Sequence, residues 1–465
     1  MTKKFLIGLF ALATITSGCE KDLDIKPTDS VNEEQVFNSV ASLQKALNTA
    51  YARYVSARVT SSYVSSLTSD ETKFGPNNGG SGQFAFRWQY NSDGTSGGDV
   101  TAMFGVHYAT IDMVNRTLAW VDKVPADPSE FEERDYIEGQ LLALRAISHF
   151  ELLEAYSKAY DAADPLGQAV MLVSCYDCRP PRNTVAETVA QIEKDLTDAK
   201  ALMPAVTPAT FNDLKLNNIT VTAIQARVAL YKREWQKAAD LATEVINANL
   251  KPLVNAAGFA GIWTDDNTNE ILFRGRLENS AALGGQWTST NGNVIFSPSD
   301  KLTNSYPAGD IRLTEYIGTN GVGARYVKKF SQSSRGGSIV DLKAIRTAEM
   351  YLIRAEARAE LDDLVGAAQD IDAIRDMRIA GHGDVSYPDK PTAIADIMLE
   401  RFRELAFEGF RFFDLKRKNM DVQRAASDVD SPLWQTLSAG NFRFVYPIPN
   451  DDILANPNMK QNDDY

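Results

Sequence analysis

The sequence predicts a mainly α fold: a tetratricopeptide-like scaffold of stacked helical hairpins that carries a loop-rich face with a few short strands. Two observations predict this class. Alanine-rich helical segments recur in pairs along the chain. A glycine-rich stretch of about 95 residues then interrupts the helical pattern, and helices return after it.

The clearest repeat consists of two helical segments that begin at Trp235 and Leu364, 129 positions apart. In both segments, small or apolar residues recur at the spacing of one helix face, and each segment follows an alanine-rich helix. Such a helix pair cannot bury its own apolar face, so it stacks on neighbouring pairs. We expect further pairs at 102–159 and 184–231.

The first long helix is expected to follow Asn32, which together with Gln35 matches a capping box. Apolar residues at helical spacing continue to Tyr54 and give this helix one buried face. Between residues 60 and 98 the pattern gives way to Ser, Gly and Asn. We therefore expect loops there, with one strand at 84–90.

Three later helices have recognisable starts. Helical spacing of apolar residues resumes around Met103. Ser129 with Glu132, and Thr184 with Glu187, match capping boxes, in which the two side chains satisfy free backbone N–H groups of the first turn. We expect a helix to begin at each of these two places.

The stretch 251–345 contains 12 of the 29 glycines and reads as loops with short strands, expected at 270–273 and 293–296. Long loops on a rigid scaffold usually carry binding residues rather than serving as simple connections. We therefore expect the ligand-binding face of the protein to lie in this stretch.

The first residues are typical of a secreted lipoprotein. Lys3 and Lys4 precede an apolar run at 5–15 that is too short to span a bilayer, and small residues lead to Cys19. We expect Cys19 to be acylated; the alternative is an ordinary cleaved signal with an incidental cysteine. The predicted organisation is a signal peptide at 1–18, a lipidated tether at 19–31, an N-terminal helical part at 32–250, and a C-terminal part at 251–465 with the loop-rich ligand region and the final helical scaffold.

Charge and cysteine content restrict the partners. The formal net charge of −13 would be repelled by phosphate backbones, so nucleic acid is excluded as a partner. Cys175 and Cys178 remain besides Cys19. A redox pair needs its first thiol at a helix start, which the prolines after Arg179 prevent. The pair is either a small disulfide loop or two inert thiols.

No catalytic or metal-binding motif is complete. The segment 94–98 matches the Gly-x-Ser-x-Gly elbow of hydrolases, but its three glycines make a loose loop, and the three histidines of the chain are scattered. The segment 265–269 is similar to a calcium loop, but Glu270 stands where an EF-hand needs glycine. With 61 acidic residues in the chain, a pair of catalytic carboxylates of the glycosidase type stays an open alternative, and no particular pair is singled out. We expect no cofactor and no metal.

Aromatic residues in the loops are better candidates for binding. Trp88, Trp287 and Tyr306 lie in segments rich in Gly, Ser and Asn. A ring face beside directed hydrogen-bond donors and acceptors suits sugar rings and also peptides. We take Trp88, Asn91, Trp287, Tyr306 and Arg325 as candidate ligand-binding residues. The alternative is that the rings fasten the loops to the core, as we expect for Trp235 and Trp263.

Two C-terminal segments carry a resemblance to a known family. Residues 400–417 read ERFRELAFEGFRFFDLKR, and the chain ends with YPIP at 446–449 and NPNMKQN at 456–462. With LDIKP at 23–27, these segments closely resemble the SusD/RagB family of surface lipoproteins. Physically, the first segment is a helix that ends near Gly409, and its salt-bridged charges beside phenylalanines form a structural clamp.

The resemblance implies a cell-surface lipoprotein, anchored in the outer membrane through acyl chains such as palmitate on Cys19 and facing outward. It implies a non-catalytic protein that captures oligosaccharide and delivers it to a SusC-like TonB-dependent outer-membrane transporter. A peptide-binding member of the same family and a tethered hydrolase are the alternatives. The binding residues of this family vary between its members, so no site residue follows from the resemblance.

Overall fold

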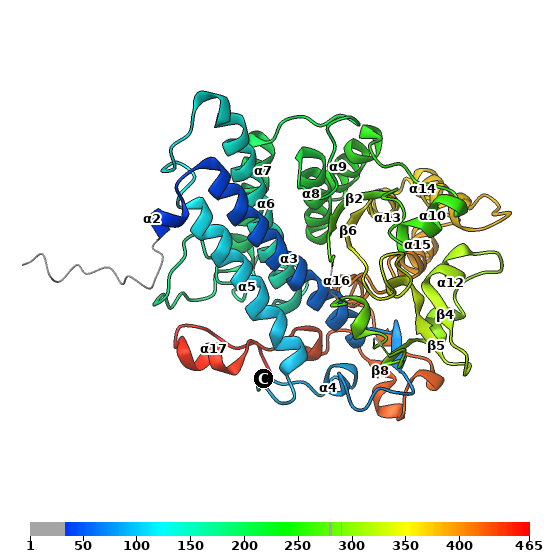
Figure 1. Cartoon of the computed structure of the whole chain (residues 1–465). Coiled ribbons are helices and arrows are strands. Elements are labelled where there is room, and N and C mark those ends of the chain that lie inside the picture. The colour runs from blue at the N-terminus through cyan, green and yellow to red at the C-terminus, as the bar shows by residue number, and fades with distance from the viewer. Residues whose placement is uncertain (1–32, 279–280, 290) are drawn as a thin grey trace, which may run out of the picture.

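The computed structural model describes residues 33–278, 281–289 and 291–465 (Figure 1). The protein is mainly helical, and its strands are short and paired two by two, so the predicted fold class is confirmed. No helix in these ranges is long and apolar enough to cross a membrane. The predicted signal peptide, the tether with Cys19 and the cap residue Asn32 lie outside the described residues.

Four long helices build one side of the scaffold (Figure 1). After the single turn α2 (Glu33–Val36), the central helix α3 (Val40–Thr68) packs against α5 (Gly98–Leu118) and α6 (Phe131–Tyr156). On its other flank α6 packs against α7 (Val185–Leu202). The N-terminal part thus consists of antiparallel helices arranged largely in chain order.

Helix α3 differs from its prediction at both ends. It begins at a capping box on Ser39, whose side chain accepts from the backbone N–H of Ser42. It continues to Thr68 instead of ending near residue 60, and several of its serine and threonine hydroxyls bond back to the helix itself. The hydroxyls of Ser61 and Thr68, for example, donate to carbonyls four residues earlier. These bonds keep polar side chains satisfied inside a buried helix.

Two predicted helix starts can be compared with the structure. The capping box of Thr184 and Glu187 is present at the start of α7, as predicted. For α6, the reciprocal pair is Asp127 with Glu130, two residues before the predicted pair, and one short 3₁₀ turn precedes the helix. The helix itself lies where the sequence placed it.

The predicted repeat is confirmed as two helical hairpins. α8 (Asn218–Lys232) packs on α9 (Trp235–Ala248), and α13 (Thr347–Glu360) packs on α14 (Leu364–Arg378). α9 also packs on α13, so the two hairpins stack although 98 residues (249–346) separate them in the chain. α15 (Lys390–Glu404) completes this layer against α13 and α14. The further predicted pairs correspond to α5 with α6 and α7 with α8.

The glycine-rich segment forms separate antiparallel strand pairs. β2 (Ile271–Gly275) pairs with β6 (Leu342–Arg346), and β4 (Ile317–Thr319) pairs with β5 (Arg325–Val327). The remaining short elements are β1 (Thr72–Phe74) with β3 (Phe296–Pro298), β7 (Val422–Gln423) with β8 (Thr436–Leu437), and the helices α4 (Gln83–Phe86), α10 (Ala256–Trp263), α11 (Asp300–Thr303), α12 (Ile311–Tyr316), α16 (Arg411–Arg417) and α17 (Asn450–Ala455).

The strand predictions are confirmed in part. The strand at 270–273 appears as β2, and the one at 293–296 begins later, as β3. The strand expected at 84–90 is wrong, because this segment contains the short helix α4 and a turn at Trp88 with positive φ. Its alternating aromatics pack on the core from a helix and turn instead of from a strand.

One continuous apolar core runs through both parts of the chain, from Phe37 to Ile448, and a second core around Ile371 lies between α13, α14 and α15. Trp263 is fully buried, as predicted, whereas Trp235 is half-buried. Cys175 and Cys178 form a disulfide in the loop between α6 and α7. The disulfide loop, one of the two alternatives left open by the sequence, is therefore the one observed.

The end of α3 is tied to α16 by a buried ion pair. Asp70 is fully buried, and its carboxylate lies 2.8 Å from Nε of Arg411 and 2.6 Å from Nζ of Lys301. Burial alone would raise the pKa of Asp70, but Arg411 and Lys301 bring it down from 3.8 to about 2.

This lowered pKa predicts acid sensitivity at one site. Because the folded pKa lies below the unfolded value, the stabilisation is complete above about pH 4 and is lost as the pH falls toward 2, about 2 kcal/mol in all. We expect Asp70→Asn to be less stable than the native chain at pH 7, with the difference shrinking by that amount at pH 2. Urea unfolding at several pH values measures it. A difference that stays constant with pH would contradict the prediction.

Candidate functional site

A hollow of about 680 Å³ opens in the glycine-rich segment, where the sequence places the binding face. Three tight turns of the chain surround it. Their lining residues are Ala281, Thr288, Ser289, Gly292, Val294, Asn320, Tyr326, Ser331, Gly336, Gly337, Ser338 and Ile339. We call this the loop hollow. Its size suits a ligand of a few sugar units or a short peptide.

Local hydrogen bonds hold each turn in shape. The N–H of Ser289 donates to the carbonyl of Asn293, and the N–H of Ser333 donates to the carbonyl of Gly337. In the third turn, the side-chain oxygen of Asn320 accepts from the N–H groups of Val322 and Ala324. The turns are therefore built before a ligand arrives, and their backbone groups need little ordering on binding.

Tyr326 brings an aromatic ring to the loop hollow. It lies on β5 opposite Gly318 of β4, and a Cβ atom at Gly318 would come within 2.4 Å of the ring carbon Cζ. The ring therefore rests on bare backbone, in a space that any other residue at position 318 would narrow. The hydroxyl of Tyr326 forms no hydrogen bond to other described residues. The side chain offers an apolar face with a free polar end.

Three successive side chains at the loop hollow leave polar atoms unpaired. Oε1 of Gln286, Nε1 of Trp287 and Oγ1 of Thr288 are buried and have no hydrogen-bond partner among the described residues. Thr288 is only 8% exposed and lines the hollow. Because buried polar groups are nearly always paired, the orphaned hydroxyl of a residue that lines a hollow is a candidate partner for a ligand or water.

Trp287 connects the loop hollow to the C-terminal motif. Its indole packs 5.4 Å from the ring of Phe407 and 6.3 Å from the ring of Phe330, measured between ring centroids. Phe407 belongs to the 400–417 segment, and Phe330 directly precedes Ser331 of the lining. Trp287, the neighbour of the lining residue Thr288, therefore packs on the C-terminal motif.

The same motif contributes to a buried charge cluster. The carboxylate of Glu404, the last residue of α15, lies 2.9 Å from Nη1 of Arg346, 3.1 Å from Nε of Arg378 and 3.1 Å from Nη1 of Arg312. Glu408 lies 2.6 Å from Nη2 of Arg346. The predicted structural clamp is confirmed, because these charges pair with each other inside the protein. The cluster consists of Glu270, Arg312, Lys329, Arg346, Arg378, Glu400, Glu404 and Glu408.

The charges of this cluster pair with one another and thereby stabilise the fold. Burial alone would raise the pKa of Glu404, but Arg378, Arg346 and Arg312 together hold it well below its ordinary value. Burial lowers the pKa of Lys329 to about 8, and Glu408 opposes that shift. Against the effect of burial, neighbouring cations likewise lower the pKa values of Glu400 and Glu408, so these two carboxylates and that of Glu404 are engaged in ion pairs and are poorly suited to act as general acids.

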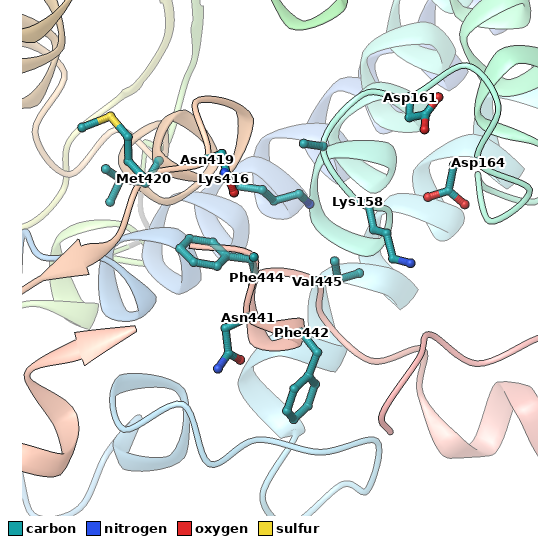
Figure 2. A pocket seen from close by; sticks show the side chains of 13 residues that line it. Lys158, Asp161, Asp164, Lys416, Asn419, Met420, Asn441, Phe442, Phe444 and Val445 are labelled. Carbon is teal, nitrogen blue, oxygen red and sulfur yellow. The ribbon is translucent and has the colours of Figure 1, made fainter. Parts of the chain in front are cut away.

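A second hollow of about 300 Å³ lies between the loop after α6 and the C-terminal segment (Figure 2). Phe442, Phe444 and Val445 come from the C-terminal side, whereas Lys158, Asp161 and Asp164 come from the other side. Lys416 between them donates to the carbonyls of Glu154 and Ser157 at the end of α6, and burial lowers its pKa to about 7. This amine is engaged in capping α6.

A third hollow, of about 480 Å³, lies beside the disulfide loop. Phe104, Tyr108 and Met459 form part of its wall, and Asp177 and Arg179 lie at it. Tyr176, between the two cysteines, is fully exposed. The three hollows differ in charge, and only the loop hollow lies in the segment where the sequence predicts binding.

Three of the five candidate ligand residues are buried. Trp287 has no exposed surface, Trp88 is 6% exposed and Tyr306 is 7% exposed. Nε1 of Trp88 donates to the carbonyl of Thr68, and the hydroxyl of Tyr306 donates to the carbonyl of Arg403. In this arrangement the rings fasten loops to the core, the alternative stated above, and a ligand cannot stack on them.

The other two candidates are exposed but occupied locally. Asn91 accepts from the backbone N–H of Asp93, and Nη1 of Arg325 lies 3.1 Å from Asp300. None of the five candidates lines the loop hollow, although Trp287 and Arg325 are each adjacent in sequence to a lining residue. Sequence reasoning missed Thr288, Asn320 and Tyr326. The absence of charge around Thr288 and Asn320 was a signal that could have found these two, whereas Tyr326 directly follows Arg325 and had no such signal.

One group of described residues has the residue types of a hydrolase triad. Ser61, His107 and Glu151 approach each other, with Oγ of Ser61 at 2.9 Å and Oε2 of Glu151 at 3.3 Å from the same ring nitrogen of His107. A triad needs the serine and the acid on opposite nitrogens, and all three residues are buried between helices. In the described ranges no group of His, Cys, Asp and Glu gathers in a way that could hold a metal ion.

Stacked helical hairpins support a preformed hollow in this protein, an arrangement typical of binding proteins. A model of the SusD family matches residues 284–465, and a second model, described as starch-binding associating with outer membrane, matches residues 21–230. The chain belongs to the SusD family, as the C-terminal motifs predicted.

Individual relatives agree with this assignment. SusD-like protein P2 of Formosa agariphila is 24% identical, over 99% of this chain and 99% of the relative. A SusD superfamily protein from Bacteroides thetaiotaomicron superimposes with a TM-score of 0.80 at 22% identity, over 91% of this chain and 99% of that one. A putative sugar binding protein from Bacteroides vulgatus superimposes with a TM-score of 0.79 at 24% identity, over 92% of this chain and 99% of that one. These structures share the fold.

Proposed function

We propose that this protein captures oligosaccharide at the cell surface, in the loop hollow, without cleaving it. One observation carries the proposal: a hollow of about 680 Å³ combines the ring of Tyr326 with the unpaired, buried hydroxyl of Thr288. Sugar rings have apolar C–H faces and hydroxyl edges, and this pair of groups complements both. The family description, starch-binding associating with outer membrane, supports the ligand class and the location.

The same proposal includes an anchor and a partner. Acyl chains on Cys19 would hold the protein at the outer membrane, beside a SusC-like TonB-dependent transporter that receives the oligosaccharide. Tethering both proteins to one membrane raises their effective concentration, so their mutual affinity need not be high. The support is the resemblance of the leader to lipoprotein signals and the family to which the chain belongs.

Replacing Thr288 by valine tests the site. The hydroxyl has no partner inside the protein, so its removal should leave the free energy of unfolding unchanged or raise it. If the hydroxyl bonds to the sugar, affinity should fall by about 1 to 1.5 kcal/mol, roughly five- to tenfold. Calorimetric titration with an oligosaccharide that the native chain binds measures the affinity, and urea unfolding measures the free energy of unfolding.

Thr303→Val is the matched control. Thr303 is also 8% exposed, but its hydroxyl donates to the carbonyl of Ser299 at 2.8 Å. This variant should lose about 1 kcal/mol of stability and keep its affinity. If Thr288→Val binds oligosaccharide as tightly as the native chain, the ligand does not use the loop hollow as proposed. If peptides bind there and sugars do not, the ligand class is wrong.

A further inference from the structure

The loop hollow is free of charge in a chain in which 23% of residues are charged. None of its lining residues is ionisable except Tyr326. The uncharged character extends to much of the surrounding chain. The described stretches 281–289, 291–298, 317–324 and 336–340 contain no Asp, Glu, Lys, Arg or His, whereas Arg335 lies in the turn between Ser333 and Gly337. A ligand in this hollow therefore meets hydroxyl, amide and backbone groups, and no ion.

The charged residues that border these loops are also neutralised. Arg325 pairs with Asp300 at 3.1 Å, and Arg335 pairs with Asp341 at 2.6 Å. The other bordering charges are paired as well: Glu278 with Arg276, Glu315 with Lys328, Asp341 with Arg274, and Asp300 with Lys73. No bordering carboxylate or cation is left to face an ionic ligand alone.

The two other hollows described above do contain charged residues. The hollow in Figure 2 contains Lys158, Asp161, Asp164 and Lys416, and the hollow at the disulfide contains Asp177, Arg179 and Asp452.

We infer, on the basis of the proposed function, that the loop hollow selects uncharged oligosaccharides and rejects those that carry carboxylate or sulfate groups. An ionic group that enters the hollow gives up its hydration without gaining a counter-charge, which is costly. A neutral sugar gives up only hydroxyl hydration, and Thr288, Asn320 and the turn backbones offer replacement bonds. The net charge of −13 adds repulsion against polyanions.

The test compares sugars that differ in charge alone. Neutral hexasaccharides of the gluco, manno and xylo series are titrated calorimetrically, and each hexose binder is then compared with its C6-oxidised and its sulfated form at the same length. We expect the charged forms to bind at least tenfold more weakly. If a charged form binds as tightly as its neutral counterpart or more tightly, and Thr288→Val weakens that binding, the inferred selectivity is overturned. The proposed function would still stand, because the sugar would still bind in the loop hollow. If no saccharide of either kind binds, the proposed function falls, and the selectivity with it.

Asn320→Asp gives a second, independent readout. Aspartate keeps the side-chain oxygen that accepts from Val322 and Ala324, so the turn should persist, while one negative charge enters the hollow. Chitosan hexaose at pH 6 is the probe, since its amines are cationic there. We expect this variant to bind chitosan hexaose at least fivefold more tightly than the native chain does. If the variant binds chitosan hexaose no more tightly than the native chain, the loop hollow does not discriminate ligands by their charge, and the inference is overturned.

Discussion

Replacing Glu404 by glutamine is expected to reduce the free energy of unfolding by about 3 to 5 kcal/mol. The carboxylate is fully buried and is contacted by three guanidinium groups, on Arg312, Arg346 and Arg378. The amide keeps the shape but removes the charge, which leaves buried cations under-compensated. Urea unfolding at pH 7, followed by circular dichroism, measures the loss.

Glu244→Gln is the control for this prediction. Glu244 pairs with Lys200 at 2.7 Å, but its side chain is 45% exposed. Water screens such a pair, so this variant should lose less than about 1 kcal/mol. Similar losses in the two variants would mean that the buried charge cluster contributes no more to stability than a surface pair.

Replacing Tyr326 by alanine is expected to weaken oligosaccharide binding by about 1 to 3 kcal/mol, roughly 5- to 150-fold. Among the described residues that line the loop hollow, Tyr326 carries the one aromatic ring, and it is half-buried. Its loss removes the flat face on which a sugar would stack, while the strand pair β4–β5 keeps its backbone bonds. Titration of the best-binding neutral oligosaccharide measures the effect.

Two further variants make this prediction specific. Gly318→Ala keeps the ring but places a methyl group where ring carbons of Tyr326 lie, so the ring must move and binding should weaken as well. Tyr176→Ala removes the fully exposed ring beside the disulfide and should leave affinity unchanged. Weaker binding in Tyr176→Ala, with normal binding in Tyr326→Ala, would move the site to the hollow at the disulfide.

The scaffold could be predicted because its signals are local. The capping box at Thr184 and the small residues spaced along α9 and α14 depend on neighbours within one or two helical turns. The charge-rich segment 400–417 also predicted a structural clamp made of salt-bridged charges. Its partners could not be read from the sequence, because Arg378, Arg346 and Arg312 stand 26, 58 and 92 positions away from Glu404.

The site residues were harder to predict for a physical reason. Composition identifies a loop, but it does not say which of the aromatics in that loop turns inward. Trp88 and Trp287 occur in polar, glycine-rich segments and are nevertheless buried. Tyr326 contributes its ring because the residue opposite, in a paired strand, is Gly318, and this register appears only in three dimensions. The glycine-rich composition of 251–345 predicted the segment that contains the hollow, and the uncharged stretches 279–298 and 317–324 are sequence signals closer to the hollow itself.

A structure of the protein with its best-binding neutral oligosaccharide tests the central claim most directly. The predicted result is a sugar ring stacked on Tyr326 in the loop hollow, with a sugar hydroxyl within hydrogen-bond distance of Oγ1 of Thr288. A sugar seated instead in the hollow of Figure 2, or beside the disulfide at Tyr176, would contradict the site proposed for this protein.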